Sequence, residues 1–337
     1  MRAVGYYEPQ DIDLPSSLVD LEVPEPEPGL RDLIVRVRAV AVNPVDTKIR
    51  RRRHATDGKP VILGWDAAGE VVHAGSECRL FRVGDRVFYA GERERPGCNS
   101  EYQAVDERLV ARAPAGLDWE SAAALPLTAL TSWEALFDRL RMPEGAGYGA
   151  KLLIVGGAGG LGSIAIQLAK ALSKATVIAT ASRPETVAWC RDMGADDVLD
   201  HRGDLAAQLA ERGHGEVDYV FLTAATDTYM ALLPRIVAPQ GAICAVVDTT
   251  VPHDLRPFKE KSLTFSWESM FTRSFFQTPD MIRQHEMLTS VASEVTRGSV
   301  RSTVTERYGT LNAERLRRAH SQLESGTTIG KIVLSGY

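Results

Sequence analysis

The first third of the chain has the hydrophobic pattern of short β-strands. Residues Leu33 to Val42 (LIVRVRAVAV) alternate apolar and charged positions, which predicts a half-buried strand. Ala67 to His73 and Asp85 to Tyr89 are predicted as further short strands. Turn-forming stretches such as PEPEPG at 24–29 separate them. Residues 1 to about 120 are therefore expected to form a small antiparallel barrel or sandwich.

From about residue 121 the pattern changes to alternating strands and helices. Strands are predicted at Lys151–Val155, Ala175–Ala181, Asp197–Leu199, Asp218–Leu222, Gly241–Val247 and Ser262–Ser266. Helical patterns at Leu161–Leu172, Pro184–Met193 and Leu205–Arg212 lie between them. The continuous hydrophobicity of these strands indicates burial on both faces, as in a parallel sheet covered by helices. The last segment is predicted to contain a long amphipathic helix near Met281–Gly298, a second helix at Asn312–Ser325 and a strand at Lys331–Leu334.

A glycine-rich turn joins the first of these strands to its helix. The segment VGGAGGLG at 155–162 contains G-x-G-x-x-G directly after a strand and at the start of a helix, the context of a dinucleotide-binding turn. The first glycine permits the tight turn, the second lets the backbone approach a pyrophosphate, and the third lets helix and strand pack closely. The helix N-terminus then offers N–H groups to the phosphates. The predicted cofactor contacts are Gly157, Gly159, Gly160, Leu161 and Gly162. A plain strand-to-helix turn is the alternative.

The end of the second strand indicates which dinucleotide is bound. A site for NAD places an Asp or Glu there to accept from the ribose hydroxyl. This strand instead ends Ala181-Ser182-Arg183, without a carboxylate. Ser182 can donate a hydrogen bond, and the Arg183 guanidinium can pair with a 2′-phosphate. The sequence therefore predicts NADPH as cofactor, with a solvated loop arginine as the alternative for Arg183.

Composition and charge bound the class of protein. The 337 residues favour about two domains, and the formal charge of -5 disfavours a protein that coats nucleic acid or anionic membrane. The most basic run, KIRRRRH at 48–54, is expected to be a solvated surface helix or loop. The four scattered cysteines suggest neither a zinc ribbon nor a disulfide framework. An N-terminus without an apolar region, and no apolar run of about 18 residues, predict a cytoplasmic protein without a membrane helix.

Several segments together resemble one known superfamily. They are VRAVAVNPVDTKIR (36–49), GWDAAGEVV (64–72), VGDRVFY (83–89), LPLTALTSWEAL (125–136), VGGAGGLGSIAIQLAK (155–170) and GKIVL (330–334). In order and spacing they resemble the medium-chain dehydrogenase/reductase superfamily, especially its quinone oxidoreductase branch and the bacterial zinc-type alcohol dehydrogenase-like proteins. The resemblance implies a GroES-like catalytic domain (1–124 and 266–337) with an inserted Rossmann NADP-binding domain (125–265). It also implies an active site in the cleft between the domains, and a homodimer or homotetramer.

The chain departs from its zinc-dependent relatives at the metal ligands. The resemblance places a Cys of those relatives at Asn43 and a His-Glu pair at Trp65-Asp66. Their structural-zinc lobe carries four cysteines, whereas residues 90–102 here hold only Cys98. Zinc requires thiolate and imidazole ligands, so a protein without a metal is predicted.

Further contacts follow from the resemblance and from the strand ends. The resemblance places Thr128 and Thr131 near the nicotinamide and its phosphates, and His201 near the adenine or 2′-phosphate; a surface-loop role is the alternative for His201. Ligands of open parallel sheets bind beyond the carboxyl ends of the strands. This rule adds the residues at the ends of the fourth and fifth strands, Thr223, Ala224, Val247 and Asp248.

Without a metal, reduction of an electron-poor acceptor is easier than oxidation of an alcohol. Asn43 is a candidate donor to the substrate oxygen, with a turn as the alternative role. Asp46 is a candidate to orient Asn43 or a water, or to bind a cofactor hydroxyl, with a helix cap as the alternative. Trp65, Trp267 and Phe271 are candidates to line an apolar acceptor pocket. Core packing or a subunit contact is preferred for Phe275 and Phe276.

These observations favour an NADPH-dependent, zinc-independent oxidoreductase that transfers hydride to a small electrophilic substrate, a quinone or an α,β-unsaturated carbonyl. Asn43, Asp46 and Thr128 are the catalytic candidates. The alternatives are a zinc-dependent alcohol dehydrogenase and a non-catalytic NADPH-binding regulator or RNA-binding protein.

Overall fold

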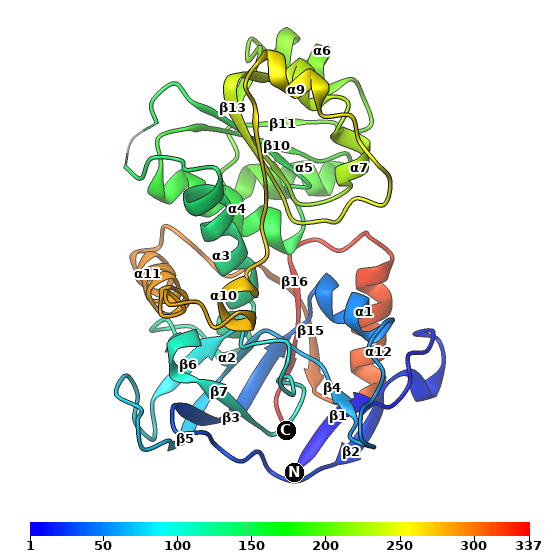
Figure 1. Ribbon diagram of the computed structural model, residues 1–337, viewed down its shortest axis with the longest axis vertical. Coiled ribbons are helices and arrows are strands. Elements are labelled where there is room, and N and C mark those ends of the chain that lie inside the picture. Colours follow the sequence, from blue (N-terminus) through cyan, green and yellow to red (C-terminus); the bar gives the residue numbers. More distant parts are fainter. Residues whose placement is uncertain (146) are drawn as a thin grey trace. The chain divides into compact units, whose positions relative to one another are not determined.

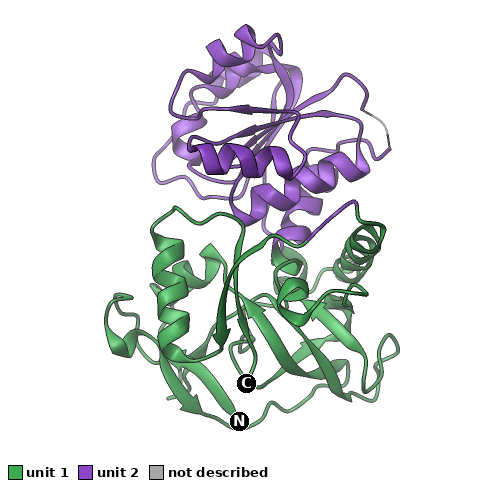
Figure 2. Ribbon diagram, turned by 180° about the vertical axis from the view of Figure 1, so that it is seen from behind, with its two compact units in different colours: residues 1–127, 271–298, 302–337 green, residues 128–270, 299–301 purple. Residues whose placement is uncertain are grey.

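The computed structural model describes residues 1–145 and 147–337 and divides them into two compact units (Figure 2). Unit 1 comprises residues 1–127, 271–298 and 302–337. Unit 2 comprises residues 128–270 and 299–301, so one unit interrupts the other along the chain. Among the described residues, no helix is both long enough and apolar enough to cross a membrane.

Unit 1 is built mainly from short strands. The strands are β1 (Arg2–Tyr6), β2 (Val19–Glu22), β3 (Asp32–Ala41), β4 (Val61–Ile62), β5 (Ala67–Ala74), β6 (Arg86–Tyr89), β7 (Tyr102–Asp106), β8 (Val110–Arg112), β15 (Val304–Thr310) and β16 (Lys331–Ser335). The α-helices are α1 (Pro44–Arg50), α2 (Trp119–Ala123), α10 (Thr272–Phe275), α11 (Arg283–Arg297) and α12 (Ala313–Glu324). Two short 3-10 turns, η1 (Pro15–Ser17) and η2 (Glu107–Leu109), complete the unit.

The main sheet of unit 1 runs in the order β15-β16-β3-β5-β6-β8, and β7 also pairs with β3 (Figure 1). A second sheet has the order β2-β1-β4. The strands predicted from the alternating pattern are confirmed as β3, β5 and β6. In β3 only Arg36 and Arg38 reach solvent, because neighbouring strands cover the rest of this central strand. The last strand, β16, pairs antiparallel with β3, so residues 304–335 extend the sheet that residues 32–112 form.

Unit 2 is an open parallel sheet with helical crossovers. Its strands are β9 (Lys151–Val155), β10 (Thr176–Thr180), β11 (Asp197–Leu199), β12 (Val217–Leu222), β13 (Val237–Ala245) and β14 (Thr264–Trp267). Its helices are α4 (Gly160–Leu172), α5 (Pro184–Asp192), α6 (Leu205–Glu211), α7 (Thr226–Tyr229), α8 (Leu233–Ile236) and α9 (Arg256–Glu260). Helix α3 (Pro126–Trp133), which begins at the boundary with unit 1, leads into the π-helical turn η3 (Glu134–Arg139).

The strand order β11-β10-β9-β12-β13-β14 is that of a doubly wound dinucleotide-binding sheet. All neighbouring strands are parallel, and residues such as Leu153, Ile178, Val220 and Ile243 are fully buried between the sheet and its helices. The predicted fold class, a GroES-like β-rich domain with a Rossmann domain, is confirmed.

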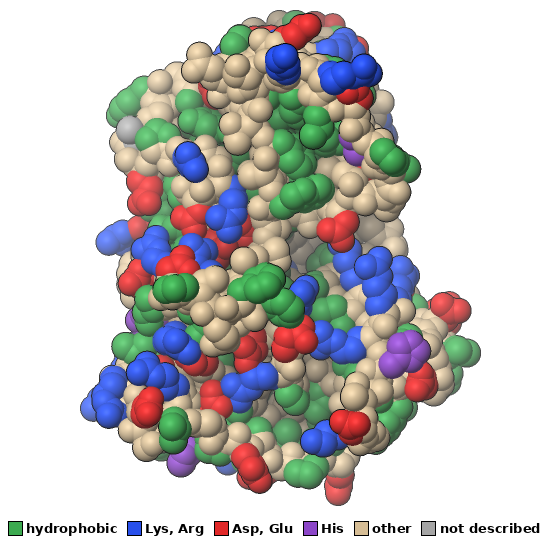
Figure 3. Space-filling model, in the orientation of Figure 1, with side chains coloured by type: hydrophobic (Ala, Val, Ile, Leu, Met, Phe, Trp, Pro, Cys, Tyr) green, Lys and Arg blue, Asp and Glu red, His purple; other side chains and the backbone are tan. Residues whose placement is uncertain are grey.

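The basic run at 48–54 differs from its prediction at one residue. Lys48, Arg51, Arg52 and His54 are exposed as expected, and Figure 3 shows basic side chains gathered over α1. Arg50 is instead fully buried, and its guanidinium donates to Glu324 of α12. The expectation was wrong for Arg50 because α1 turns it onto the inner helix face, four residues after the buried Asp46.

Candidate functional site

Three polar side chains of unit 1 meet beside three neighbouring strands. Asn43 follows the end of β3, Asp66 precedes the start of β5, and Lys331 is the first residue of β16. In the antiparallel pair of β16 and β3, Val333 lies opposite Ala41, so the same register brings Lys331 beside Asn43. Ala41 donates its backbone N–H to the carbonyl oxygen of Asp66, the residue that precedes β5. Strand β3 therefore carries Asn43 between Lys331 on one side and Asp66 on the other.

The three side chains bind one another directly. The Lys331 ammonium donates to Asp66 Oδ2 at 2.8 Å, to Asn43 Oδ1 at 2.5 Å and to the carbonyl oxygen of Val42 at 3.0 Å. Asn43 Nδ2 donates to the same Asp66 Oδ2 at 2.8 Å. The backbone N–H of Leu127 donates to Asp66 Oδ1 at 2.7 Å. We call Asn43, Asp66 and Lys331 the polar triad.

The polar triad is an ion pair removed from water. The side chains of Lys331 and Asp66 are 3% and 0% exposed. Burial raises the pKa of Asp66, while Lys331 and the N–H of Leu127 act in the opposite direction. Among the described residues, the three groups that bind the Asp66 carboxyl oxygens (Asn43 Nδ2, the Leu127 N–H and Lys331 Nζ) are all donors, which is the arrangement of an ionised carboxylate.

Asp46 lies beside the polar triad at the start of α1. Its Oδ2 accepts the backbone N–H of Asn43 at 2.7 Å, so Asp46 caps the helix that Asn43 begins. Its Oδ1 is buried and has no hydrogen-bond partner among the described residues. Burial raises the pKa of Asp46 to about 7, against the Asn43 N–H and Lys331, while the nearby Asp66 raises it further.

Aromatic side chains predicted for the acceptor pocket fall in both units. In unit 1, Trp65 and Phe271 are buried and meet edge to face at 6.0 Å between ring centroids. Trp267, in β14 of unit 2, is 48% exposed and packs on Phe265. Its role in the pocket stays a prediction.

Core packing, one of the two interpretations preferred for Phe275 and Phe276, is wrong for both. They are 40% and 69% exposed at the end of the short helix α10. The two rings pack on each other, and the Arg93 guanidinium lies over Phe275.

In unit 2, the glycine-rich turn joins β9 to α4 and is shaped largely by backbone contacts. The positive φ of +84° belongs to Gly156, so the tight turn depends on this residue and the role predicted for Gly157 was wrong. A Cβ on Gly157 would lie 2.7 Å from Ala179 Cβ, so Gly157 serves close packing against β10. A Cβ on Gly162 would overlap the carbonyl oxygen of Gly156, which fits the predicted helix–strand approach.

A Cβ on Gly159, by contrast, would meet nothing closer than 3.8 Å. Gly159 is the N-cap of α4, a helix of 13 residues, and Gly160 and Leu161 begin that helix. The first N–H groups of a helix have no partner within it and suit an anion. The turn therefore has an open side at the positive end of the helix dipole, as a pyrophosphate site requires.

Basic side chains lie beyond the ends of β10 and β11. Arg183 is the N-cap of α5, and its guanidinium pairs with Glu185 at 3.0 Å. Arg202 donates to the carbonyl oxygen of Ser182 at 2.8 Å and so connects the two loops. Between them in the chain, His201 is exposed, and Arg202 lowers the pKa of the neighbouring Asp200 to about 2. Arg202 was not predicted, although it stands next to His201.

The remaining predicted cofactor residues lie shortly after strands of the sheet or on helix α3. Thr223 follows β12 and donates to the carbonyl oxygen of Val155 at 2.6 Å, so the ends of β12 and β9 are joined. Val247 accepts a hydrogen bond from Thr226 at 2.7 Å. Ala224 and Asp248 are exposed beyond the same edge. Thr128 and Thr131 are buried on α3, three residues apart.

Lys331 is a second functional candidate that sequence reasoning missed. It lies in the segment GKIVL, which contributed only to the resemblance. The single signal was a lysine at the start of an otherwise apolar strand, since Ile332, Val333 and Leu334 are all fully buried. A charged residue so placed must find buried partners.

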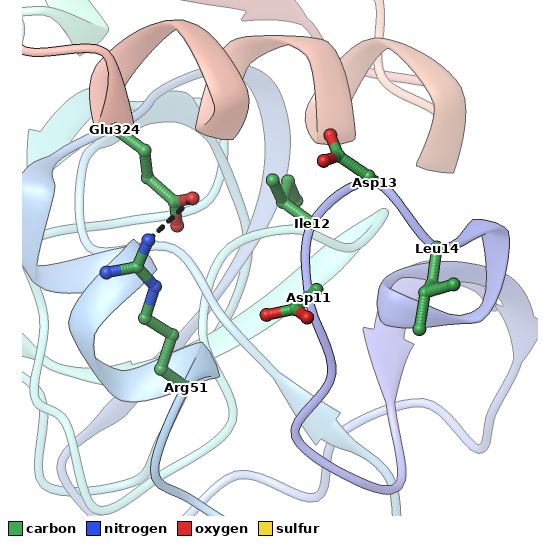
Figure 4. A pocket seen from close by; sticks show the side chains of 6 residues that line it. All are labelled: Asp11, Ile12, Asp13, Leu14, Arg51 and Glu324. Carbon is green, nitrogen blue, oxygen red and sulfur yellow. Dashed lines mark ion pairs between the residues drawn. The ribbon is translucent and has the colours of Figure 1, made fainter.

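Figure 4 shows a surface pocket in unit 1 at a different place. It is lined by Asp11, Ile12, Asp13, Leu14, Arg51 and Glu324. Arg51 and Glu324 form an ion pair at 2.9 Å across it. None of the residues predicted for catalysis or cofactor binding lines this pocket.

Comparison with known proteins finds similarity over the whole chain. Residues 29–115 match an alcohol dehydrogenase GroES-like domain, and residues 193–334 match a zinc-binding dehydrogenase. A zinc-type alcohol dehydrogenase-like protein of Staphylococcus aureus is 40% identical over 337 residues, covering 99% of this chain and 100% of the relative.

Two solved structures show the same architecture. A candidate zinc-dependent alcohol dehydrogenase from Rhizobium etli is 48% identical, with a TM-score of 0.95 over 100% of this chain and 98% of that chain. The quinone oxidoreductase of Escherichia coli, solved in complex with NADPH, is 26% identical, with a TM-score of 0.84 over 99% and 100% of the two chains.

The zinc ion in several of these descriptions does not fit the residues of this chain. The polar triad offers an amide, one carboxylate and an ammonium, and zinc sites are built from thiolate, imidazole and carboxylate ligands. The ammonium already binds the carboxylate that a cation would need. Across residues 1–145 and 147–337, no three His, Cys, Asp or Glu side chains are grouped as metal ligands.

Proposed function

Because this chain belongs to the medium-chain dehydrogenase/reductase superfamily, we propose that it is an NADPH-dependent reductase that works without zinc. The proposed acceptor is a quinone or an α,β-unsaturated carbonyl compound. One observation carries the proposal: the buried Lys331–Asp66 ion pair lies against Asn43, where zinc-dependent relatives are expected to hold their metal. The site offers hydrogen-bond donors, and its residues are not a zinc ligand set, which suits reduction of an activated acceptor.

Unit 2 would hold the cofactor. Gly159, Gly160, Leu161 and Gly162 would contact the pyrophosphate through backbone N–H groups of the α4 N-terminus. Ser182, Arg183 and His201 would contact the adenosine 2′-phosphate, because β10 ends without the carboxylate that favours NADH. The E. coli quinone oxidoreductase was solved with NADPH, which supports the same choice of cofactor here. The remaining contacts that we propose are Thr128, Thr131, Thr223, Ala224, Val247 and Asp248.

Unit 1 would hold the acceptor oxygen. A bound nicotinamide supplies the hydride in this chemistry. Asn43 Nδ2–H would donate to the acceptor oxygen as negative charge develops on it. Asp46 would keep Asn43 in place through its hydrogen bond to the Asn43 backbone. Trp65 and Phe271 would offer apolar ring surface to the acceptor.

The test is a panel of acceptors given to the purified protein with NADPH or NADH. We expect oxidation of NADPH with a benzoquinone or with methyl vinyl ketone, and little oxidation of simple alcohols with NADP. Metal analysis of the same preparation should find far less than one zinc per chain. Stoichiometric zinc, with activity lost to a chelator and restored by zinc, would support the alcohol dehydrogenase alternative instead. Tight NADPH binding without turnover of any acceptor would support a binding protein.

A single variant connects the activity to Asn43. Asn43→Ala removes the proposed donor, and loss of one such donor typically lowers kcat about 100- to 1,000-fold. Its affinity for NADPH should not change, because the proposed cofactor contacts are elsewhere.

We also propose that the protein forms a homodimer or homotetramer. Light scattering of the same preparation measures its oligomeric state.

A further inference from the structure

The polar triad forms a closed ring of contacts. Asp66 Oδ2 accepts from both Asn43 Nδ2 and Lys331 Nζ, and Lys331 Nζ also donates to Asn43 Oδ1. The ring therefore returns to the amide group from which it started. The Asn43 amide has two Nδ2 hydrogens, one on the side of its Oδ1 and one on the side of its Cβ. The ring closes only if the hydrogen on the Oδ1 side is the one that donates to Asp66.

This ring determines the orientation of the Asn43 amide. An ammonium only donates hydrogen bonds, and a carboxylate only accepts them. The amide oxygen must therefore face Lys331, and the amide nitrogen must face Asp66. A flipped amide would place its NH₂ against the ammonium and its oxygen against the carboxylate, so both contacts would become repulsive. The second Nδ2 hydrogen then points away from Asp66 and Lys331.

We propose that Lys331 is a positioning residue that, with Asp66, holds the Asn43 amide in the orientation that presents its second Nδ2–H to the acceptor oxygen. This inference rests on the reductase function proposed above. It deepens that function, because it names what aligns the donor.

The bonding of Lys331 supports a specific role over simple packing. All three hydrogens of its ammonium are used, on Val42, Asn43 and Asp66. A buried ion pair contributes little net stability compared with apolar residues of the same size. The apolar residues that follow in β16 would pair with β3 whether or not a lysine preceded them. The charge at position 331 is therefore better explained by its hydrogen bond to Asn43 Oδ1.

The test compares three variants by steady-state kinetics: Asn43→Ala, the double variant Lys331→Met/Asp66→Asn, and the triple variant that combines them. The double variant removes both charges of the ion pair at once, so neither partner is left buried without the other. We expect it to lower kcat about 10- to 100-fold, with KM and NADPH affinity within twofold, because misorientation of a donor affects mainly the transition state. The exposed Lys174→Met serves as the control and should behave like the wild type.

The triple variant distinguishes positioning from an independent effect. If Lys331 and Asp66 act through Asn43, removing them from the Asn43→Ala protein costs nothing further, and the triple variant has the kcat of Asn43→Ala. Multiplying losses would show that they act separately from Asn43 and would overturn the proposal. Unchanged kcat in the double variant would overturn it as well.

A second measurement does not depend on activity. Hydrogen exchange of the Asn43 side-chain NH₂, followed by NMR and assigned with Asn43→Ala, should be slow in the wild type and at least tenfold faster in the double variant. If the wild type reduces no acceptor, the proposed function fails, and this exchange rate still decides the role of Lys331. Equal rates in the two proteins would overturn the positioning role.

Discussion

The two candidate sites of this molecule are built in opposite ways. The turn between β9 and α4 in unit 2 is made of backbone, and its residues lie within eight consecutive positions, 155–162. The polar triad of unit 1 is made of charged and amide side chains, and Lys331 is 288 residues from Asn43 in the chain. The first site depends on the absence of side chains and the second on matched charges. Variants of the two sites should therefore fail for different reasons.

The largest effect is expected from an unpaired charge in the polar triad. Lys331→Met leaves Asp66 buried without its partner, and loss of one partner of a buried pair typically costs about 3–5 kcal/mol. The added Asp66→Asn substitution should restore most of that stability. Urea unfolding measures both. Equal stabilities of Lys331→Met and the double variant would show that the unpaired Asp66 charge does not cause the loss of stability. Arg183→Met, at a half-buried position in unit 2, should change stability by less than about 0.5 kcal/mol.

Asp46 should make the stability of unit 1 fall with rising pH. Its pKa is about 7 in the folded protein against an ordinary value of 3.8. Between these values the folded state binds more protons than the unfolded state, so the free energy of unfolding decreases as pH rises. Each step of one in pKa corresponds to about 1.4 kcal/mol, which gives a cost of up to about 4 kcal/mol above pH 7.

The variant Asp46→Asn lacks this titration. Its stability relative to the wild type should rise between about pH 4 and pH 7, the window set by the two pKa values, and then level off. Urea unfolding at several pH values gives the difference directly. A difference that does not depend on pH would mean that Asp46 is ionised throughout and matters only as a helix cap.

The same contrast explains what the sequence could predict. The parallel sheet and its glycine turn follow from local patterns, and the fold class was predicted correctly. Within the turn, the conformational requirement was assigned one residue too late, at Gly157 instead of Gly156, since φ angles are not visible in a motif. Asn43 and Asp66 were recognised as metal-ligand positions of relatives. Lys331 was not recognised, because the register of β16 on β3 brings it to Asn43 and no local pattern encodes that register.

Smaller effects are expected at the glycines, and two matched substitutions separate folding from binding. Gly162→Ala forces a Cβ against the Gly156 carbonyl and should cost about 1–3 kcal/mol of stability. Gly159→Ala has room in the protein and a φ of −71°, so its stability should stay near that of the wild type. It should nevertheless bind NADPH at least tenfold more weakly, because its methyl group occupies the open side of the turn. Unchanged NADPH affinity in Gly159→Ala would exclude a pyrophosphate there.

The smallest effect concerns the choice between NADPH and NADH. Arg183→Asp replaces the proposed partner of the 2′-phosphate with a charge that repels it, so NADPH affinity should fall about tenfold or more while NADH affinity changes less than about twofold. Arg191→Asp makes the same charge change at an exposed position near the other end of α5 and should leave the preference intact. Titration of both cofactors against protein fluorescence measures the ratio. Equal losses for NADPH and NADH would assign Arg183 to capping α5 and pairing with Glu185, and the 2′-phosphate contact would then have to come from Arg202 or His201.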